Sequence, residues 1–375
     1  QQGAELDVDF SPRGIDLTSF PYNAWRKVTR ATLMDDDKEM FLTGSPQGEP
    51  GLREAIRGYL HSARGVNCTA DQIIIGAGSE YLMMLLTQIL GTSRTIAMEN
   101  PTYRQAYRVF ESLGCQMKPV EMDAHGMNVR LLEESGADIA YVMPSHQYPM
   151  GVVMPVKRRQ ELLSWAGRGE KRYLIEDDYD SEFRYRGKPV PALQGMDIQG
   201  KVIYMGTFSK SIAPAIRVGY LVLPAPLLAV YKRKCGFYAS TVSRIDQKII
   251  YQFLTEGHYE RHLNRMRAIY KGKHDMLMSE LKTLGTEFIV QGEYAGLHVL
   301  LKYRKAGMET WLVEEAAKAR VGVYGISGFL IAPLADQKEK CFSTVVLGYA
   351  RLNEDQIREG IRRLAAAWKC SRPCP

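Results

Sequence analysis

The sequence lacks the features that would place a protein in a membrane or build a zinc site. No apolar run approaches the about 20 residues needed to cross a bilayer. The first residues show no basic stretch followed by an apolar one, as a secretory signal would. The six cysteines form no Cys-x-x-Cys pair and have no matched spacing to the seven histidines. We therefore expect reduced thiols, a cytoplasmic location, no bound metal and no membrane partner.

Signals for nucleic-acid binding are equally sparse. The formal net charge of +7 is mild for 375 residues. The basic runs at 231–234 and 261–267 are interpreted as solvated helix faces rather than as nucleic-acid contacts. No helix-turn-helix pattern, internal repeat or low-complexity segment is visible. These residues themselves predict no DNA-binding surface.

Short apolar runs alternate with helical stretches through much of the chain. Bounded by turn residues, they predict strands at 73–76, 95–98, 139–143, 173–176, 202–205 and 218–223. The alternation predicts an α/β fold with a mostly parallel, doubly covered sheet. A long helical stretch interrupted at Gly257 follows, and an α+β remainder completes the chain. We expect an N-terminal segment that joins the small domain, a large domain and a small C-terminal domain, at 1–44, 45–284 and 285–375.

One lysine lies in a turn whose composition suits covalent chemistry. A predicted strand ends in Gly206-Thr207-Phe208-Ser209-Lys210, and Arg217 follows seven residues after the lysine. A lysine amine attacks a carbonyl when burial or nearby positive charge lowers its pKa. The hydroxyls of Thr207 and Ser209 and the Arg217 guanidinium are groups that bind a phosphate. The pattern alone is also typical of a solvated turn, so its interpretation depends on residues elsewhere.

Three other strand ends supply the groups that complete a cofactor site. They lead to the acid Asp177 with Tyr179, to the glycine-rich turn Gly78-Ser79-Glu80, and to Tyr103. Ligands of open α/β sheets bind beyond the carboxyl ends of the strands, and a helix N-terminus suits a phosphate. An acid that keeps a pyridinium nitrogen protonated, a lysine and a phosphate cradle together predict a site for pyridoxal 5′-phosphate (PLP). Tyr103 would stack on its ring. Asp178 is interpreted as a solvated loop acid.

These motifs resemble the fold-type I PLP enzymes of the aspartate aminotransferase superfamily, from about Asp9 to about Trp368. More narrowly, the chain resembles the aminotransferase-like domain of MocR/GabR-type bacterial transcription regulators of the GntR family. That resemblance rests on the segments 144–149 (PSHQYP), 175–183 (IEDDYDSEF) and 257–267 (GHYERHLNRMR). It implies a large PLP-binding domain and a smaller α+β domain.

The resemblance also implies roles for individual residues. Lys210 would be the catalytic residue and would carry PLP as a Schiff base. Asp177 would pair with the ring nitrogen, Tyr179 would bond the ring 3′-oxygen and Tyr103 would stack on the ring. The phosphate would be surrounded by Gly78, Ser79, Glu80 (through its backbone amide), Thr207, Ser209 and Arg217.

The chain departs from the superfamily pattern at several positions. Its segment 146–151 (HQYPMG) replaces the usual Asn-Pro-Thr-Gly. Thr43 stands where relatives often carry a tyrosine that reaches the neighbouring subunit's phosphate. Val346 occupies the place of the arginine that usually clamps the substrate carboxylate, and Arg351 lies five residues further on. Whether Arg351 replaces that arginine is left open by the sequence. Without a bidentate arginine a carboxylate loses binding energy and orientation, so these departures favour PLP binding over ordinary transamination.

Two classes of function follow. In the one we favour, the chain is the effector-sensing domain of a MocR-type regulator that responds to PLP or to an amino compound. It would form a homodimer and reach DNA only through a domain outside this chain. In the other, intact Lys210, Asp177 and Tyr179 make it an active aminotransferase for an amino acid/2-oxo acid pair. Racemisation or β-elimination also stays open, because the fold does not determine the reaction.

Overall fold

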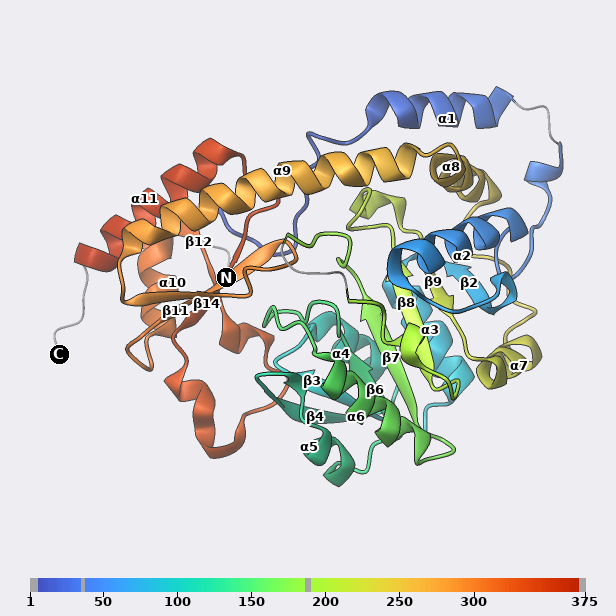
Figure 1. Cartoon of the computed structure of the whole chain (residues 1–375), viewed down its shortest axis with the longest axis horizontal. Coiled ribbons are helices and arrows are strands. Elements are labelled where there is room, and N and C mark those ends of the chain that lie inside the picture. The colour runs from blue at the N-terminus through green and yellow to red at the C-terminus, as the bar shows by residue number, and fades with distance from the viewer. Residues whose placement is uncertain (1–5, 35–37, 186–189, 371–375) are drawn as a thin grey trace.

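The computed structural model describes residues 6–34, 38–185 and 190–370, and these residues form two main β-sheets (Figure 1). The larger sheet has eight strands and the smaller has four. The long helix α9 (His258–Leu281) extends over both in the view of Figure 1. None of the helices in these ranges is long and apolar enough to span a bilayer.

The larger sheet has the strand order β2-β9-β8-β7-β6-β3-β4-β5. Its centre, from β8 to β4, is parallel. At the ends, β9 pairs antiparallel with β2 and β8, and β5 pairs antiparallel with β4. The predicted α/β fold with a mostly parallel sheet is confirmed. The strands are β2 (Ile73–Gly76), β3 (Thr95–Asn100), β4 (Gln116–Asp123), β5 (Gly126–Met127), β6 (Ile139–Val142), β7 (Tyr173–Asp178), β8 (Val202–Thr207) and β9 (Gly219–Val222).

Helices cover both faces of this sheet, which explains the continuous apolar runs of its strands. In β2, Ile74 packs in a cluster with residues of α3, whereas Ile73 and Ile75 pack on the other face with residues of α2 and α8. Strand residues on both faces must therefore be apolar. The helices around the sheet are α2 (Pro50–Arg64), α3 (Gly78–Leu90), α4 (Arg104–Ser112), α5 (Val129–Glu134), α6 (Val156–Gly167), α7 (Ala225–Lys234) and α8 (Arg244–Thr255).

The smaller sheet is antiparallel, in the order β10-β11-β14-β13. Its core includes Leu277 of α9, Val345 of β14 and Ile361 of α11. The predicted helical stretch before it divides into α8 and α9 at Gly257, whose φ of 70° favours glycine. This region comprises β10 (Phe288–Gln291), β11 (His298–Tyr303), α10 (Glu309–Lys318), β12 (Val321–Gly322), β13 (Tyr324–Gly325), β14 (Thr344–Gly348) and α11 (Glu354–Cys370).

The N-terminal segment connects the two sheets. Its strand β1 (Val8–Asp9) pairs in parallel with β12. Further along, the buried carboxylate of Asp16 forms an ion pair with Lys273 of α9 at 2.8 Å. Helix α1 (Tyr22–Met34) then packs against α8. These attachments on both sides hold the intervening residues, Pro12 and Arg13, at the carboxyl edge of the larger sheet.

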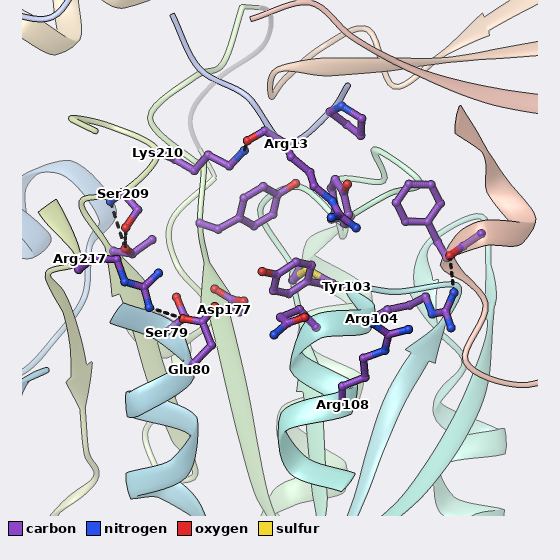
Figure 2. Close-up of a pocket in the computed structure, with 18 residues that line it drawn as sticks. Arg13, Ser79, Glu80, Tyr103, Arg104, Arg108, Asp177, Ser209, Lys210 and Arg217 are labelled. Atoms are coloured by element: carbon purple, nitrogen blue, oxygen red, sulfur yellow. Dashed lines mark hydrogen bonds and ion pairs between the residues drawn. The ribbon is translucent and has the colours of Figure 1, made fainter. Parts of the chain in front are cut away.

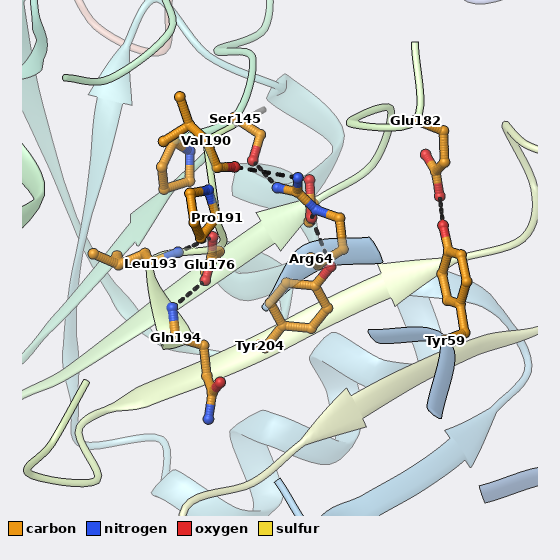
Figure 3. A network of polar contacts seen from close by, with 12 residues as sticks. Tyr59, Arg64, Ser145, Glu176, Glu182, Val190, Pro191, Leu193, Gln194 and Tyr204 are labelled. Carbon is orange, nitrogen blue, oxygen red and sulfur yellow. Dashed lines mark hydrogen bonds and ion pairs between the residues drawn. The ribbon is translucent and has the colours of Figure 1, made fainter. Parts of the chain in front are cut away.

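Asp178 is buried, so its interpretation as a solvated loop acid was wrong. Its Oδ2 accepts hydrogen bonds from Arg64 Nε at 2.8 Å and from the Tyr204 hydroxyl at 2.6 Å (Figure 3). Arg64 also donates to Ser145 Oγ at 2.7 Å. Burial by itself raises the pKa of Asp178, but the charge and hydrogen bonds of Arg64 outweigh it and lower the pKa. The alternation of a strand explains this burial, because Asp178 faces away from the side that Asp177 faces.

We expect Arg64→Ala to destabilise the protein strongly, because it leaves the carboxylate of Asp178 buried without its cation. Removing one partner of a buried pair costs about 3–5 kcal/mol. The matched control is Arg57→Ala on the same helix, whose exposed pair with Glu54 has a distance of 2.6 Å and contributes little to stability because solvent screens it. Thermal unfolding followed by circular dichroism compares the two. Equal melting temperatures would contradict the assigned role of Arg64.

Candidate functional site

A pocket of about 410 Å³ lies beyond the carboxyl ends of β3, β7 and β8 (Figure 2). Its size is typical of a site for a small organic molecule. Of the predicted site residues, Gly78 does not line it, but Gly78 begins helix α3 directly before two that do. The structure brings the others together in its wall: Ser79, Glu80, Tyr103, Asp177, Tyr179, Thr207, Ser209, Lys210 and Arg217.

One side of the pocket has the groups of an anion site. Helix α3 begins after Ala77, whose side chain provides no cap, so no N-cap side chain occupies its first backbone N–H groups. Arg217 lies beside this turn, and a Cβ at Gly78 would come within 2.7 Å of its guanidinium. Arg217 also pairs with Glu80 at 2.7 Å. Its own φ of 51° is rare for a residue with a side chain and is typical of functional sites.

The hydroxyls of the lysine turn lie on the same side of the pocket. Thr207 Oγ1 lies 3.1 Å from Ser209 Oγ and accepts a hydrogen bond from the Ser209 backbone N–H at 3.1 Å. Figure 2 shows Ser209, Arg217, Ser79 and Glu80 gathered at the left of the view. Together with the start of α3, these donors suit a phosphate.

Asp177 is the buried acid of the site. Burial, together with the charges of Asp178 and Asp180, raises its pKa to about 7, although a hydrogen bond from the Tyr141 hydroxyl opposes the rise. A cationic group placed against this carboxylate would stabilise its ionised form. A protonated pyridine nitrogen is such a group.

Tyr179 belongs to a buried polar cluster that sequence reasoning missed. Its hydroxyl lies 3.1 Å from His146 Nδ1, which lies 2.9 Å from Asp180 Oδ2. His146 and Asp180 both occur in segments that carry the family resemblance, so their position there was an available signal. The contact with His146 holds the Tyr179 hydroxyl in place, and the charge of Asp180 also acts on the Lys210 amine.

Lys210 Nζ donates a hydrogen bond to the backbone carbonyl of Arg13 at 3.1 Å. Burial lowers the pKa of this amine, and the charge of Arg13 adds to the effect. A lowered pKa increases the neutral fraction of the amine, which is the form that attacks a carbonyl. The local environment of Lys210 therefore suits covalent attachment of an aldehyde.

Several other pocket residues were not predicted. Arg13 comes from the N-terminal segment, far from Lys210 in sequence, and no local signal identifies it. Arg104 and Arg108 line the pocket from α4. Their i,i+4 spacing just after Tyr103 places them on one helix face, a signal that the sequence did contain.

The two positions considered for substrate binding lie outside this wall. Val346 is fully buried and packs in a core cluster with Ile326 and Phe329. Arg351 forms an ion pair with Asp9 at 3.6 Å and does not line the pocket. The question that the sequence left open is thereby answered: Arg351 does not take the place of the missing arginine in this pocket.

These observations fit PLP. The glycine turn and the helix start would suit the phosphate, the buried Asp177 carboxylate would suit the ring nitrogen, and the lysine with a lowered pKa would suit the aldehyde. The aromatic ring of Tyr103 lies between the phosphate side and the opposite wall (Figure 2). When bound, PLP supplies an electron sink for reactions of amines.

Comparisons with known proteins agree with this geometry. The family model for aminotransferase class I and II matches residues 16–364. The uncharacterized HTH-type transcriptional regulator YdeL of Bacillus subtilis is 39% identical over 98% of this chain and 79% of its own length. The probable rhizopine catabolism regulatory protein MocR of Rhizobium meliloti is 30% identical over 96% and 72%. The multiple substrate aminotransferase of Thermococcus profundus superposes with a TM-score of 0.85 at 25% identity, covering 98% of this chain and 92% of that one.

We expect Gly78→Ala to weaken PLP binding about tenfold or more, since its Cβ displaces the Arg217 guanidinium and a hydrogen bond to a charged group contributes about 1.5–3 kcal/mol. Gly91→Ala is a matched control, because Gly91 has a similar φ of 90° but no atom within 4 Å of an added Cβ. Titration of the cofactor-free proteins with PLP measures both affinities. The assigned phosphate site is wrong if the two substitutions weaken binding equally.

Proposed function

The chain belongs to the class I and II aminotransferase family, in the branch found in MocR-type transcriptional regulators, and from this premise we propose that it is a PLP-binding, effector-sensing domain of such a regulator. In this proposal, Lys210 holds PLP covalently through Nζ as a Schiff base. The domain responds to PLP or to an amino compound that binds beside it. DNA is reached through a helix-turn-helix domain outside this chain, and the protein acts in the cytoplasm.

The observation that carries the proposal is the contrast between the two halves of the site. The groups for the cofactor are assembled, as described for Arg217, Asp177 and Lys210. The strand position that clamps a substrate carboxylate in the superfamily is instead the buried Val346, which packs in the core. Such a site binds a cofactor firmly but lacks a rigid clamp that orients a substrate for proton transfer.

The other roles proposed for cofactor binding use side chains that line the pocket. The Asp177 carboxylate would pair with the ring nitrogen, the Tyr179 hydroxyl would bond the ring 3′-oxygen and Tyr103 would lie against the ring. The phosphate would occupy the side of the pocket that contains Arg217. Lys210 Nζ would be the group that attaches the cofactor and carries a proton during its chemistry.

An active aminotransferase is the second candidate. It is favoured by the lysine whose lowered pKa suits both attachment and proton transfer, and by the structural similarity to the multiple substrate aminotransferase. The two candidates differ in turnover: a sensor binds its amino compound and stops, whereas an aminotransferase releases a 2-oxo acid repeatedly.

A homodimer is part of the proposal. Helix α1, the short 3₁₀ helix η1 (Lys38–Phe41) and the residue after it expose large apolar side chains, which are Leu33, Met34, Phe41 and Leu42. Phe41 is 76% exposed. Exposed large apolar side chains on neighbouring segments favour a protein interface. They directly precede Thr43, where relatives often carry a tyrosine that reaches the neighbouring subunit.

To test the function, the PLP-loaded protein is mixed with pairs of amino acids and 2-oxo acids while cofactor absorbance and released 2-oxo acid are recorded. We expect absorbance changes without sustained release. Borohydride reduction followed by mass spectrometry should fix PLP to wild type but not to Lys210→Ala. Lys201→Ala is the control and should still be labelled, because Lys201 Nζ bonds the carbonyls of Gly169 and Glu170 outside the pocket.

Repeated turnover with any pair would overturn the sensor function in favour of the aminotransferase. A protein–PLP adduct that persists in Lys210→Ala would overturn the assignment of the lysine.

We expect Phe41→Glu to shift the dimer toward the 42.4 kDa monomer, because it puts a charge into the apolar contact. The control is Ile198→Glu, an isolated side chain that is 96% exposed. Light scattering coupled to gel filtration measures both masses. A wild-type protein that is monomeric at micromolar concentration would contradict the dimer, and an unchanged Phe41→Glu dimer would contradict this interface.

A further inference from the structure

The pocket has a second positively charged wall that the cofactor does not account for. Arg13, Arg104 and Arg108 line it, and Figure 2 shows them across Tyr103 from the side that contains Arg217. On the phosphate side, Arg217 already has Glu80 as its ion-pair partner. Within the described parts of the chain, no carboxylate forms an ion pair with any of the three arginines on the second wall. Their charge is therefore available to an anionic ligand.

Of these three arginines, Arg13 is the one that contacts the reactive lysine, Lys210. Its backbone carbonyl is 3.1 Å from Lys210 Nζ, and the charge of its side chain helps to lower the pKa of Lys210. Its guanidinium also hydrogen-bonds the side chain of Tyr148, which opposes the rise that burial imposes on the pKa of Tyr148. The side chain thus extends from the lysine toward the aromatic wall of the pocket.

Aromatic rings line the pocket beside these arginines, whose own side chains are exposed. The rings of Tyr148 and Phe329 have centroids 5.4 Å apart, and those of Tyr148 and Tyr103 are 6.0 Å apart. Arg104 Nη1 donates to the carbonyl of Gly328 at 3.0 Å, which fixes Arg104 beside Phe329.

The presence of an amine and a guanidinium in the wall of one pocket indicates the class of ligand. An amino acid carries its carboxylate only a few bonds from its nitrogen, so an amino acid whose nitrogen takes the place of Lys210 Nζ brings its acid group close to Arg13. The planar fork of a guanidinium matches a carboxylate. Val346 is apolar and buried, and Arg351, whose side chain lies beside Gly14 and pairs with Asp9, does not line the pocket. Arg13 does line it and also contacts Lys210 through its backbone carbonyl.

We propose that Arg13 binds the carboxylate of an amino-acid effector, and that Arg104 and Arg108 supply positive charge at the same wall. The effector is then an amino acid, rather than a simple amine or PLP alone. This inference rests on the proposed sensor function and names the ligand class of the same site. A ligand bound to Arg13 would also be connected to the N-terminal segment. Arg13 lies in that segment between β1 and the Asp16–Lys273 ion pair, which hold the segment in place.

The test uses the PLP-loaded protein and pairs of probes that differ only in the acid group: alanine against ethylamine, and 4-aminobutanoate against butylamine. Titration followed by cofactor absorbance gives each dissociation constant. We expect wild type to bind at least one acid about tenfold or more tightly than its matched amine. In Arg13→Ala that acid should bind about tenfold to a hundredfold more weakly, and this loss should be larger than any change in affinity for the amines or for PLP.

Arg351→Ala is the matched control, since it removes an arginine that pairs with Asp9 on the same N-terminal segment but does not line the pocket. It should leave the preference for the acid intact. Arg104→Ala should weaken binding of the acid less than Arg13→Ala does, because Arg104 is already engaged with Gly328.

Three outcomes overturn the inference: no acid preference in the PLP-loaded wild type, no loss of acid affinity in Arg13→Ala, or an equal loss for acids and amines. The last would mean that Arg13 has only a structural role. A separate result bears on the proposed function. A wild-type protein that takes up no PLP on Lys210 overturns that function, whereas a PLP-loaded protein without acid preference overturns the inference alone.

Discussion

The parallel pairing of β7 with β8 is the constraint on which the site depends. Asp177 is opposite Met205 in this register, so the acid and the lysine turn that follows Thr207 reach the same edge of the sheet. On the other side of β8, the antiparallel strand β9 pairs with β2, with Gly219 opposite Gly76. This second pairing brings Arg217 to the start of α3. Backbone hydrogen bonds of a buried sheet thus assemble groups that are far apart in the chain.

The same strand separates two acids that are adjacent in sequence. Asp177 faces the pocket, where burial raises its pKa to about 7, and Asp178 faces away and is paired with Arg64. The neighbour Glu176 accepts hydrogen bonds from two backbone N–H groups, of Leu193 and Gln194 (Figure 3). Each buried carboxylate therefore has its own partner, and the Asp177 carboxylate is the one directed at the cofactor side. A single-residue shift of register would exchange these surroundings.

Much of the cofactor site was predictable because its signals are local. A short apolar run followed by a turn identifies a strand end, and ligands bind at such ends in α/β sheets. Lys210, Asp177 and the Gly78 turn all follow this rule. The burial of Asp178 and the antiparallel direction of β9 were not predictable in this way. Both features depend on which helix or strand packs against the residue in the folded protein. The sequence of a single strand does not specify that neighbour.

By itself the sequence determined the α/β fold, the cofactor and most of the residues that line the pocket, since each depends on composition and spacing within a few residues. Only the tertiary structure decided which arginines face the cofactor. It excludes Arg351, which pairs with Asp9, and it brings Arg13 to Lys210 from the opposite end of the chain. The physical reason is that Arg13 is positioned by contacts of its segment with β12 and α9. Contacts between such distant segments form only when the chain is folded.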